Sequence, residues 1–259
     1  MALTLNNLIG DLTGFPIFAG GGARLLGFGT SDEIDVEDGN LSSFPWGVWG
    51  LDGNDTIAGS SDSNERLLGN NGDDVIGGGG GNDIIYGGKE NDRLDGNDGN
   101  DVVRGDAGND IIFGGFGNDI LRGGQGDDDL DGNEDNDFLV GDRGIDVLTG
   151  GPGADIFVLR SNEEFGVNGA DVITDFNFDE GDRIGLTDGL TELDLFFTDD
   201  NLIAYDNDGF INDMVIENSR NGQIVGIVLN TNSFELTGAF EQASPFALAV
   251  NGSQFQFLA

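Results

Sequence analysis

Residues 69–86 read GNNGDDVIG followed by GGGGNDIIY, and residues 105–122 read GDAGNDIIF followed by GGFGNDILR. From residue 50 to residue 158 the chain divides into twelve such units of nine residues, with one extra residue in the second unit. Position one is glycine in all twelve units, and position four is glycine in nine of them. A pattern held over twelve units is an internal repeat, and the repeat must be interpreted before any single element.

Positions six and eight distinguish the unit from a merely glycine-rich stretch. Position six is acidic in every unit, and position eight is always apolar. The apolar residues are Ile57, Leu67, Ile76, Ile85, Leu94, Val103, Ile112, Leu121, Leu130, Leu139, Leu148 and Phe157. Because neighbours along a strand point to opposite sides, position eight is predicted to face inward and positions seven and nine outward.

The unit resembles the GGxGxDxUx nonapeptide of the RTX, or hemolysin-type calcium-binding, family. This resemblance implies an all-β fold, namely a right-handed parallel β-roll solenoid in which six residues of each unit form a turn and three form a short strand. It also implies that two nonapeptides make one coil of 18 residues. Calcium would then lie between successive turns on the same side of the roll.

The chemistry of the unit supports calcium independently. Ca²⁺ takes roughly 6–8 oxygen ligands in a flexible shell, so one aspartate per turn must be supplemented by turn carbonyls. Glycine at positions one and four permits positive φ and a close approach of carbonyl oxygens to an ion. The predicted metal-site residues are Asp55, Asp74, Asp83, Asp92, Asp101, Asp110, Asp119, Asp128, Asp137, Asp146 and Asp155, with Gly72, Gly81, Gly99, Gly108, Gly117 and Gly126.

Alternation of sides predicts two ladders of acids. The first ladder contains Asp55, Asp74, Asp92, Asp110, Asp128 and Asp146, and the second ladder contains Glu65, Asp83, Asp101, Asp119, Asp137 and Asp155. Six turns leave five gaps in each ladder, so the roll is expected to hold several calcium ions, up to about ten.

Two alternatives to calcium stay open here. The aspartates could simply cap tight turns, although carboxylates stacked at ~4.8 Å would repel one another without a cation. Mg²⁺ suits a carbonyl-rich turn less well because it demands a near-ideal octahedron. Three turns also depart from the pattern, since Glu90 and Asp135 replace the glycine of position four and the unit of Glu65 carries the insertion. Sites at these turns are expected to be weak or empty.

The repeat predicts that folding depends on metal. One inward apolar residue per nine gives a thin core that must offset the conformational entropy of the whole roll. Binding of calcium to the folded form alone adds stability at every site. We therefore expect an expanded chain without calcium and a compact roll with it.

Residues 1–49 are predicted to be an N-terminal cap that includes one degenerate unit. Asp32 and Ile34 fall at the sixth and eighth positions of this unit, although Thr30 replaces the glycine of position four. The aromatic cluster at 44–49 is interpreted as the cover of the terminal coil, which a solenoid needs. A sugar-binding aromatic platform is the alternative.

Residues 159–259 are predicted to be a β-rich region that follows the roll at 50–158. DVITDF at 171–176 and GDRIGL at 181–186 resemble the segment after the roll in many secreted RTX proteins. In it, Asp171, Asp175 and Asp182 would be either calcium ligands or turn residues. The ending FQFLA is compatible with an uncleaved type I secretion signal and equally with an edge strand. Short strands are expected at 193–198, 202–205, 214–217 and 224–229.

One outer face of the roll is predicted to be apolar. Outward positions of the even-numbered units include Ile84, Val102, Ile120, Phe138 and Ile156. Either β-propensity alone places them there, or residues 159–259 or a partner cover the stripe. The exposure of Ile120 and Phe138 distinguishes the two.

The composition excludes several classes of function. The 259 residues include 47 glycines, 49 acids and 10 bases, with a net charge of −39 and neither cysteine nor histidine. Histidine-dependent metal sites, nucleophiles assisted by histidine and disulfide frameworks are therefore ruled out. So acidic a surface would repel nucleic acid. The sequence contains no apolar run of membrane-spanning length. Residues 1–6 lack the basic start and long apolar stretch of a cleaved export signal, so export without such a signal is expected.

The leading hypothesis is a secreted calcium-binding structural or surface-interaction protein, exported by the type I route. The alternative is a calcium-dependent module that binds cell-surface polysaccharide. It would use Trp46, Trp49 and Tyr86 as stacking faces, with Arg104 and Arg122 opposite acidic sugars. An enzyme is not expected, because neither flank shows GxSxG, a histidine base or a phosphate loop. The least favoured reading is an extracellular hydrolase, whose carboxylate pair would be invisible in so acidic a sequence.

Overall fold

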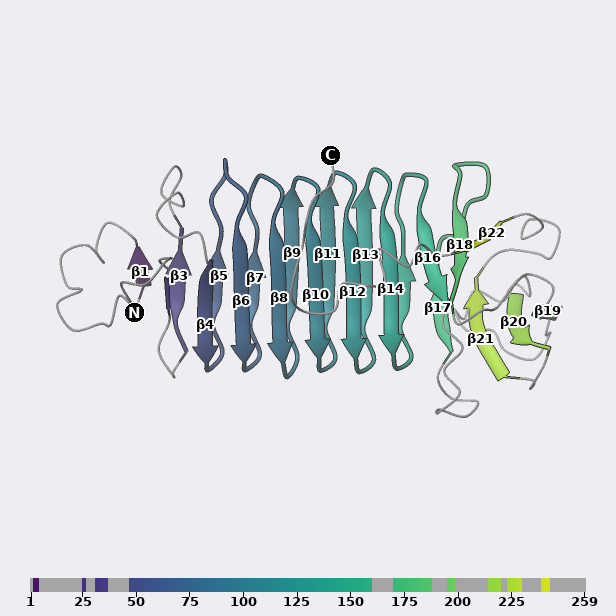
Figure 1. Ribbon diagram of the computed structural model, residues 1–259, viewed down its shortest axis with the longest axis horizontal. Helices are drawn as coiled ribbons and strands as arrows, with labels where there is room; N and C mark the ends of the chain where they lie inside the picture. Colours follow the sequence, from purple (N-terminus) through teal and green to yellow (C-terminus); the bar gives the residue numbers. More distant parts are fainter. Residues whose placement is uncertain are drawn as a thin grey trace.

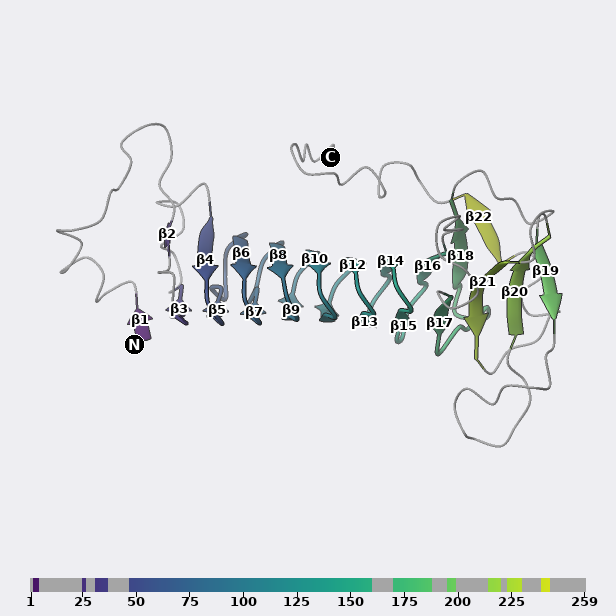
Figure 2. The same cartoon turned by 90° about the horizontal axis from the view of Figure 1, so that it is seen from below.

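The computed structural model describes residues 2–4, 25–26, 31–36, 47–159, 170–187, 195–198, 214–219, 223–229 and 239–242. Within these ranges the secondary structure is entirely β, with 22 strands and no helix. The strands lie side by side along the long axis of the molecule (Figure 1). Turned by 90°, the strands from β1 to β18 separate into two layers, with odd-numbered strands in one and even-numbered strands in the other (Figure 2).

The layer that holds the odd-numbered strands is a sheet of 12 strands that also includes β20, and we call it sheet A. In spatial order its strands are β1 (Ala2–Thr4), β3 (Glu33–Asp35), β5 (Thr56–Ala58), β7 (Val75–Gly77), β9 (Arg93–Asp98), β11 (Ile111–Phe116), β13 (Asp129–Glu134), β15 (Val147–Thr149), β17 (Asp171–Ile173), β21 (Gln223–Val228), β20 (Met214–Asn218) and β19 (Leu195–Thr198). Neighbouring strands of this sheet are parallel, except that β20 pairs antiparallel with both β19 and β21.

The even-numbered layer is a parallel sheet of 10 strands, which we call sheet B. In order its strands are β2 (Leu25–Leu26), β4 (Val48–Asp52), β6 (Arg66–Asn71), β8 (Ile84–Lys89), β10 (Val102–Ala107), β12 (Ile120–Gln125), β14 (Phe138–Arg143), β16 (Ile156–Leu159), β18 (Arg183–Leu186) and β22 (Phe240–Gln242). Ile112 is in register with Leu130 and Val103 with Leu121, an offset of 18 residues. The predicted parallel β-solenoid of 18-residue coils, about six turns long, is confirmed.

Strands in the middle of the roll are longer than the three residues that the family resemblance implied. β8 to β14 each contain six residues, positions seven to nine of one unit and one to three of the next. Pairing lapses at position one: Arg104 is in register with Arg122 and Asp106 with Gly124, while Gly105 has no partner. The strand therefore continues into what was expected to be turn, with an irregularity at the position-one glycine.

The core of the roll is the predicted stack of position-eight side chains. Each is at most 1% exposed, from Ile57 at one end to Phe157 at the other. Ile34 of the degenerate unit, at 2% exposed, and Ile173 and Ile184 beyond the repeats join the same cluster. The interior is thus one apolar side chain per strand, flanked by turns.

The two outer faces differ, as the sequence indicated. Outward side chains of sheet A are open, with Val75 46% and Ile111 41% exposed. On sheet B, Val140 and Val158 are buried and form a second hydrophobic cluster against Phe138 and Ile156. Ile120 is half-buried. The apolar stripe on sheet B is therefore buried at Val140 and Val158 and half-buried at Ile84 and Ile120, whereas Val75 and Ile111 on sheet A are exposed.

Strands from both flanks extend the two sheets of the roll. β3 pairs with β5 through Ile34 and Ile57, and β18 pairs with β16 through Ile184 and Phe157. Strands expected at 193–198, 214–217 and 224–229 are present as β19, β20 and β21. The strand expected at 202–205, the ending at 255–259 and residues 44–46 of the aromatic cluster lie outside the described residues.

Candidate metal centre

Hydrogen bonds between coils join the position-six acids into two ladders. The amide N–H of Asp74 donates to Oδ1 of Asp92 over 2.8 Å, and the amide of Asp83 donates to Oδ1 of Asp101 over 2.7 Å. The same bond recurs along both sides, at 2.6–2.9 Å from Asp55 to Asp146 and from Glu65 to Asp155. The membership of both ladders is that predicted from the alternation of sides.

Each ladder aspartate has one oxygen with a partner and one without. Oδ1 accepts an amide N–H, whereas Oδ2 is buried and has no hydrogen-bond donor in the described structure. The eleven residues with such an Oδ2 are Asp55, Asp74, Asp83, Asp92, Asp101, Asp110, Asp119, Asp128, Asp137, Asp146 and Asp155. A buried polar atom without a partner costs about 1–3 kcal/mol. Eleven buried carboxylate oxygens without a donor are therefore available to bind cations along the two ladders.

Position-one glycines leave the space that such a cation would need. A Cβ added at Gly96 would lie 2.5 Å from Oδ2 of Asp101 and 2.5 Å from the carbonyl oxygen of Gly114 in the next coil. The carboxylate oxygen and a carbonyl oxygen therefore face one small space that a side chain would fill. Position-one glycines do not adopt positive φ, so the expectation of positive φ at position one was wrong. Glycine is needed there because the carboxylate approaches so closely.

Position-four glycines do adopt positive φ, as expected. The predicted site glycines Gly72, Gly81, Gly99, Gly108, Gly117 and Gly126 have φ between 112° and 147°. A Cβ at Gly108 would also collide with the carbonyl oxygen of Glu90 in the preceding coil. Glu90 and Asp135 adopt φ of 68° and 78° at this position, so both turns keep the left-handed geometry with an unfavourable residue.

Position two is a second left-handed position that the sequence analysis missed. Six non-glycine residues occupy it with φ between 69° and 88°, namely Leu51, Asn70, Asn97, Asp106, Asn133 and Asp142, and five other units place a glycine of positive φ there. The signal was present, because Asn, Asp and Gly are the residues that tolerate this region best. Most units therefore have left-handed backbone at two positions, two and four.

Backbone carbonyls must provide most of the ligands of any bound ion. Among the described residues, no group of three or more acidic side chains is placed to hold a metal. Oxygen-rich, flexible coordination with one carboxylate per turn suits Ca²⁺. The aspartates would hold the ion, which would neutralise their charge and join adjacent coils.

The family comparison agrees with this geometry. A model of the RTX calcium-binding nonapeptide repeat matches in four copies, at residues 48–65, 60–94, 95–130 and 131–161. Residues 48–161 are RTX calcium-binding repeats. No curated protein matches the chain significantly. RTX repeats are typical of proteins exported by type I secretion. The described part of the chain holds no helix with the length and apolarity that a bilayer crossing requires.

Burial raises the pKa of the carboxyls inside the RTX roll, and nearby carboxylates raise it further, while the donated amide N–H opposes the rise. The pKa is about 8 at Asp83, Asp92, Asp128 and Asp137, about 7 at Asp119 and Asp155, and about 6 at Asp74, Asp101, Asp110 and Asp146. Burial also raises the pKa of Asp55 and Glu65. Without metal, the RTX roll therefore binds protons near neutral pH.

A ladder of amide side chains runs beside each RTX carboxylate ladder at position five. Oδ1 of Asn100 accepts the amide N–H of Asn118 over 2.8 Å, and Oδ1 of Asn82 accepts that of Asn100 over 3.0 Å. These bonds run from a later coil to an earlier one, opposite to those of the aspartates. Position five is Asn in eight units and Asp in two, so the sequence held this signal. The ladders end at Ala154 and Ile145, which donate an amide but have no side-chain acceptor.

The carboxylate ladders continue past both ends of the RTX repeats. Oδ1 of Asp55 accepts the amide of Asp32 over 2.7 Å, which places the degenerate unit on the first ladder. Oδ1 of Asp171 accepts the amide of Asp146 over 3.3 Å. Asp171 is 5% exposed, and burial raises its pKa well above the usual value. Asp171 is thus a buried member of the same ladder as Asp146.

Asp175 and Asp182 have backbone donors on both carboxylate oxygens. Asp182 extends the second ladder, since its Oδ1 accepts the amide of Asp155 over 2.9 Å, but its Oδ2 also accepts the amide of Asn177 over 2.8 Å. Asp175 accepts the amides of Gly150 and Gly151 over 2.9 and 2.7 Å. Each of these two carboxylates therefore accepts two backbone amide N–H groups.

Proposed function

We propose that this chain is an extracellular calcium-binding structural or surface-interaction protein whose RTX roll folds as it binds several calcium ions, up to about ten. One observation carries the proposal: eleven buried aspartates share one geometry, with Oδ1 bonded to the next coil and Oδ2 without a donor. A fold that buries so many anionic oxygens beside a thin apolar core needs cations for stability. Calcium content per chain, measured after dialysis against calcium and against EGTA, tests it. A metal content near zero in calcium would contradict it.

The extracellular location is part of the proposal. It rests on the RTX repeats, which are typical of type I secreted proteins, and on the high calcium concentration that metal-coupled folding requires. Expression in a bacterium that carries a type I exporter, followed by assay of medium and cells, tests it. Retention of the whole pool in the cell would oppose it.

A non-enzymatic role also belongs to the proposal. The chain has no histidine or cysteine to act as a base or nucleophile. The buried aspartates with a raised pKa belong to the ladders, where calcium would bind. Hydrolysis of polysaccharide substrates in excess calcium is the assay that would reveal the alternative.

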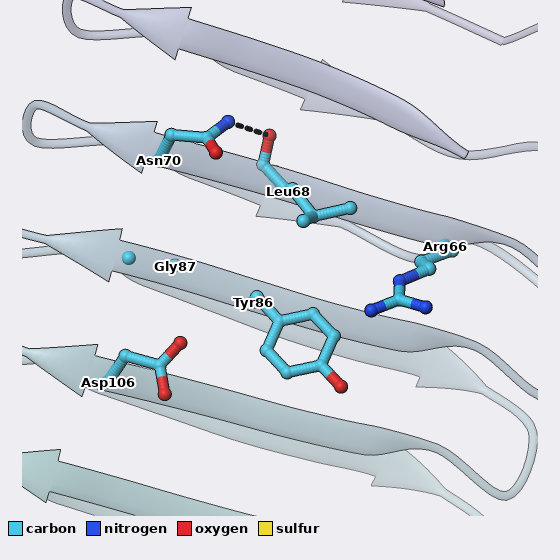
Figure 3. Close-up of a pocket in the computed structure, with 7 residues that line it drawn as sticks. Arg66, Leu68, Asn70, Tyr86, Gly87 and Asp106 are labelled. Carbon is cyan, nitrogen blue, oxygen red and sulfur yellow. Dashed lines mark hydrogen bonds between the residues drawn. The ribbon is translucent and has the colours of Figure 1, made fainter. Parts of the chain in front are cut away.

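A second candidate function, binding of a surface polysaccharide, is favoured by a depression on the outer face of sheet B. The depression measures about 150 Å³ and is lined by Arg66, Leu68, Asn70, Tyr86, Gly87, Gly88 and Asp106 (Figure 3). The Arg66 guanidinium lies 5.3 Å from the centre of the Tyr86 ring. An aromatic ring beside an amide, a carboxylate and a guanidinium has the chemistry that recognises a sugar.

The arginines expected to face acidic sugars are instead paired with carboxylates. Arg104 lies 2.5 Å from Asp106, and Arg122 forms an ion pair with Asp142. Arg66 is therefore the better candidate for an acidic sugar. A glycan array in excess calcium, with Tyr86→Ala as the comparison, tests this candidate. Equal retention by both proteins, or none by either, would contradict a role for the depression.

A further inference from the structure

The Glu65 turn differs from the other turns in how its carboxylate is satisfied. Oε1 of Glu65 accepts the hydroxyls of Ser60 and Ser63, over 2.9 and 2.7 Å, and Oε2 accepts the amide N–H of Ser60 over 3.3 Å. Ser60 is 2% exposed and Glu65 is 4% exposed. The two serine hydroxyls also lie 2.7 Å from each other. The buried carboxylate therefore has protein donors on both oxygens.

This turn nevertheless belongs to the second ladder. The amide N–H of Glu65 donates to Oδ1 of Asp83 over 2.6 Å, as every ladder aspartate does with its successor. Unlike those aspartates, Glu65 has no oxygen left without a donor. Oxygens that already accept three hydrogen bonds gain little from a cation, because the ion would have to displace those donors.

The distance between the carboxylate and the position-one glycine also differs in this unit. A Cβ at Gly59 would lie 3.1 Å from Oε2 of Glu65, farther than the 2.5 Å that separates a Cβ at Gly78 from Oδ2 of Asp83. The extra residue in this unit and the longer acid thus move the carboxylate away from the space that faces the carbonyl of the next coil.

We propose that the turn at 59–65 holds no calcium ion and that the two serines replace the metal as the partner of its buried carboxylate. The series of ions on this side of the roll then begins at Asp83. The unit at 59–68 closes without metal, whereas Asp55 and Asp74 on the opposite ladder keep the unpartnered Oδ2 that a calcium ion would use. This inference rests on the proposed function, since it presupposes calcium at the aspartate turns.

A matched pair of isosteric variants tests the inference. Glu65→Gln and Asp101→Asn remove one charge each from the same position of two turns in one ladder, with the Asp83 turn between them. We expect Glu65→Gln to bind as many calcium ions per chain as the unmodified protein, by elemental analysis after dialysis in millimolar calcium, and Asp101→Asn to bind at least one fewer. Loss of an ion from Glu65→Gln would overturn the inference. An unmodified protein without calcium would instead refute the proposed function.

A variant that restores the repeat tests the same inference by gain. Deletion of Asp62 together with Ser63→Gly and Glu65→Asp converts residues 59–68 to the nine-residue unit GSSGNDRLL. We expect this protein to bind one more ion than the unmodified chain and to need calcium to order this unit. An unchanged calcium content in the folded variant would contradict the proposed role of the serines.

Discussion

The amide N–H of Asp101 donates to Oδ1 of Asp119, one coil further along the same ladder, over 2.7 Å. That bond uses one carboxylate oxygen to join the coils and leaves Oδ2 buried without a donor. Each ladder aspartate therefore connects two coils directly and presents a free anionic oxygen to a third component. Because the arrangement repeats along both edges of the roll, whatever occupies Oδ2 acts on the whole stack.

Removing one ladder charge should weaken calcium binding locally. Asp110→Asn keeps an acceptor for the amide of Asp92 but replaces the anionic Oδ2. We expect it to lower calcium content by at least one ion and stability in calcium by about 1–3 kcal/mol. Thermal unfolding with elemental analysis measures both. The exposed Asp98 provides a matched control, and an Asp98→Asn variant with the same loss would mean that net charge alone matters.

The metal-free roll should become less stable as pH rises. Asp83 has a pKa of about 8 in the folded roll and about 4 when the chain is unfolded. Between these values the folded state binds more protons than the unfolded state, so the free energy of unfolding falls with increasing pH. Thermal unfolding in EGTA should show structure at pH 5 that is lost by pH 8. Greater metal-free stability at pH 8 would contradict the raised pKa values.

Calcium affinity should rise over the same range of pH. Calcium must displace the protons that the ladder carboxyls hold, so its binding strengthens as pH passes the pKa values of about 6 to 8. Titration calorimetry in two buffers of different protonation enthalpy would measure the protons released. We expect release at pH 6.5 and much less at pH 9; binding that releases none at either pH would speak against competition.

A methyl group at position one should block a site. The added Cβ of Gly114→Ala would lie 2.5 Å from Oδ2 of Asp119 and 2.6 Å from the carbonyl oxygen of Gly132. We expect fewer bound ions and a loss of about 1–3 kcal/mol, because the carboxylate must move. Gly77→Ala is the control, since its Cβ would meet only the Asn97 side chain, at 3.2 Å. Equal effects of the two changes would mean that position one has no special role.

The asparagine ladder should contribute stability that is independent of metal. Asn100→Ala removes the acceptor of the Asn118 amide, at an expected cost of about 0.5–1.5 kcal/mol. Calcium content should not change, because the side chain is exposed and lies outside the carboxylate ladder. A fall in bound calcium would show instead that position five takes part in the metal site.

Most of the roll could be predicted because its period is fixed. Asp at position six and an apolar residue at position eight recur every nine residues, so sides, ladders and core all follow from counting. The role of glycine at position one could not be predicted in the same way. Glycine is equally compatible with positive φ and with close contact, and only the approach of Asp101 to Gly96 distinguishes them.

Beyond residue 158 the number of residues between hydrogen-bonded acids is no longer constant, so their register cannot be predicted from the nine-residue period. Asp146 bonds to Asp171 across 25 residues and Asp155 bonds to Asp182 across 27, where the repeat uses 18. The sequence marked these acids as candidates but could not place them in register. The serine partners of Glu65 were missed because the insertion was interpreted only as a defect.

Circular dichroism of the purified full chain at pH 8, titrated with calcium from an EGTA-treated start, tests the central claim most directly. The eleven buried oxygens without donors predict a largely disordered spectrum in EGTA and a cooperative gain of β structure as calcium is added, with magnesium far less effective. A β-sheet spectrum of full strength in EGTA, unchanged by calcium, would contradict it.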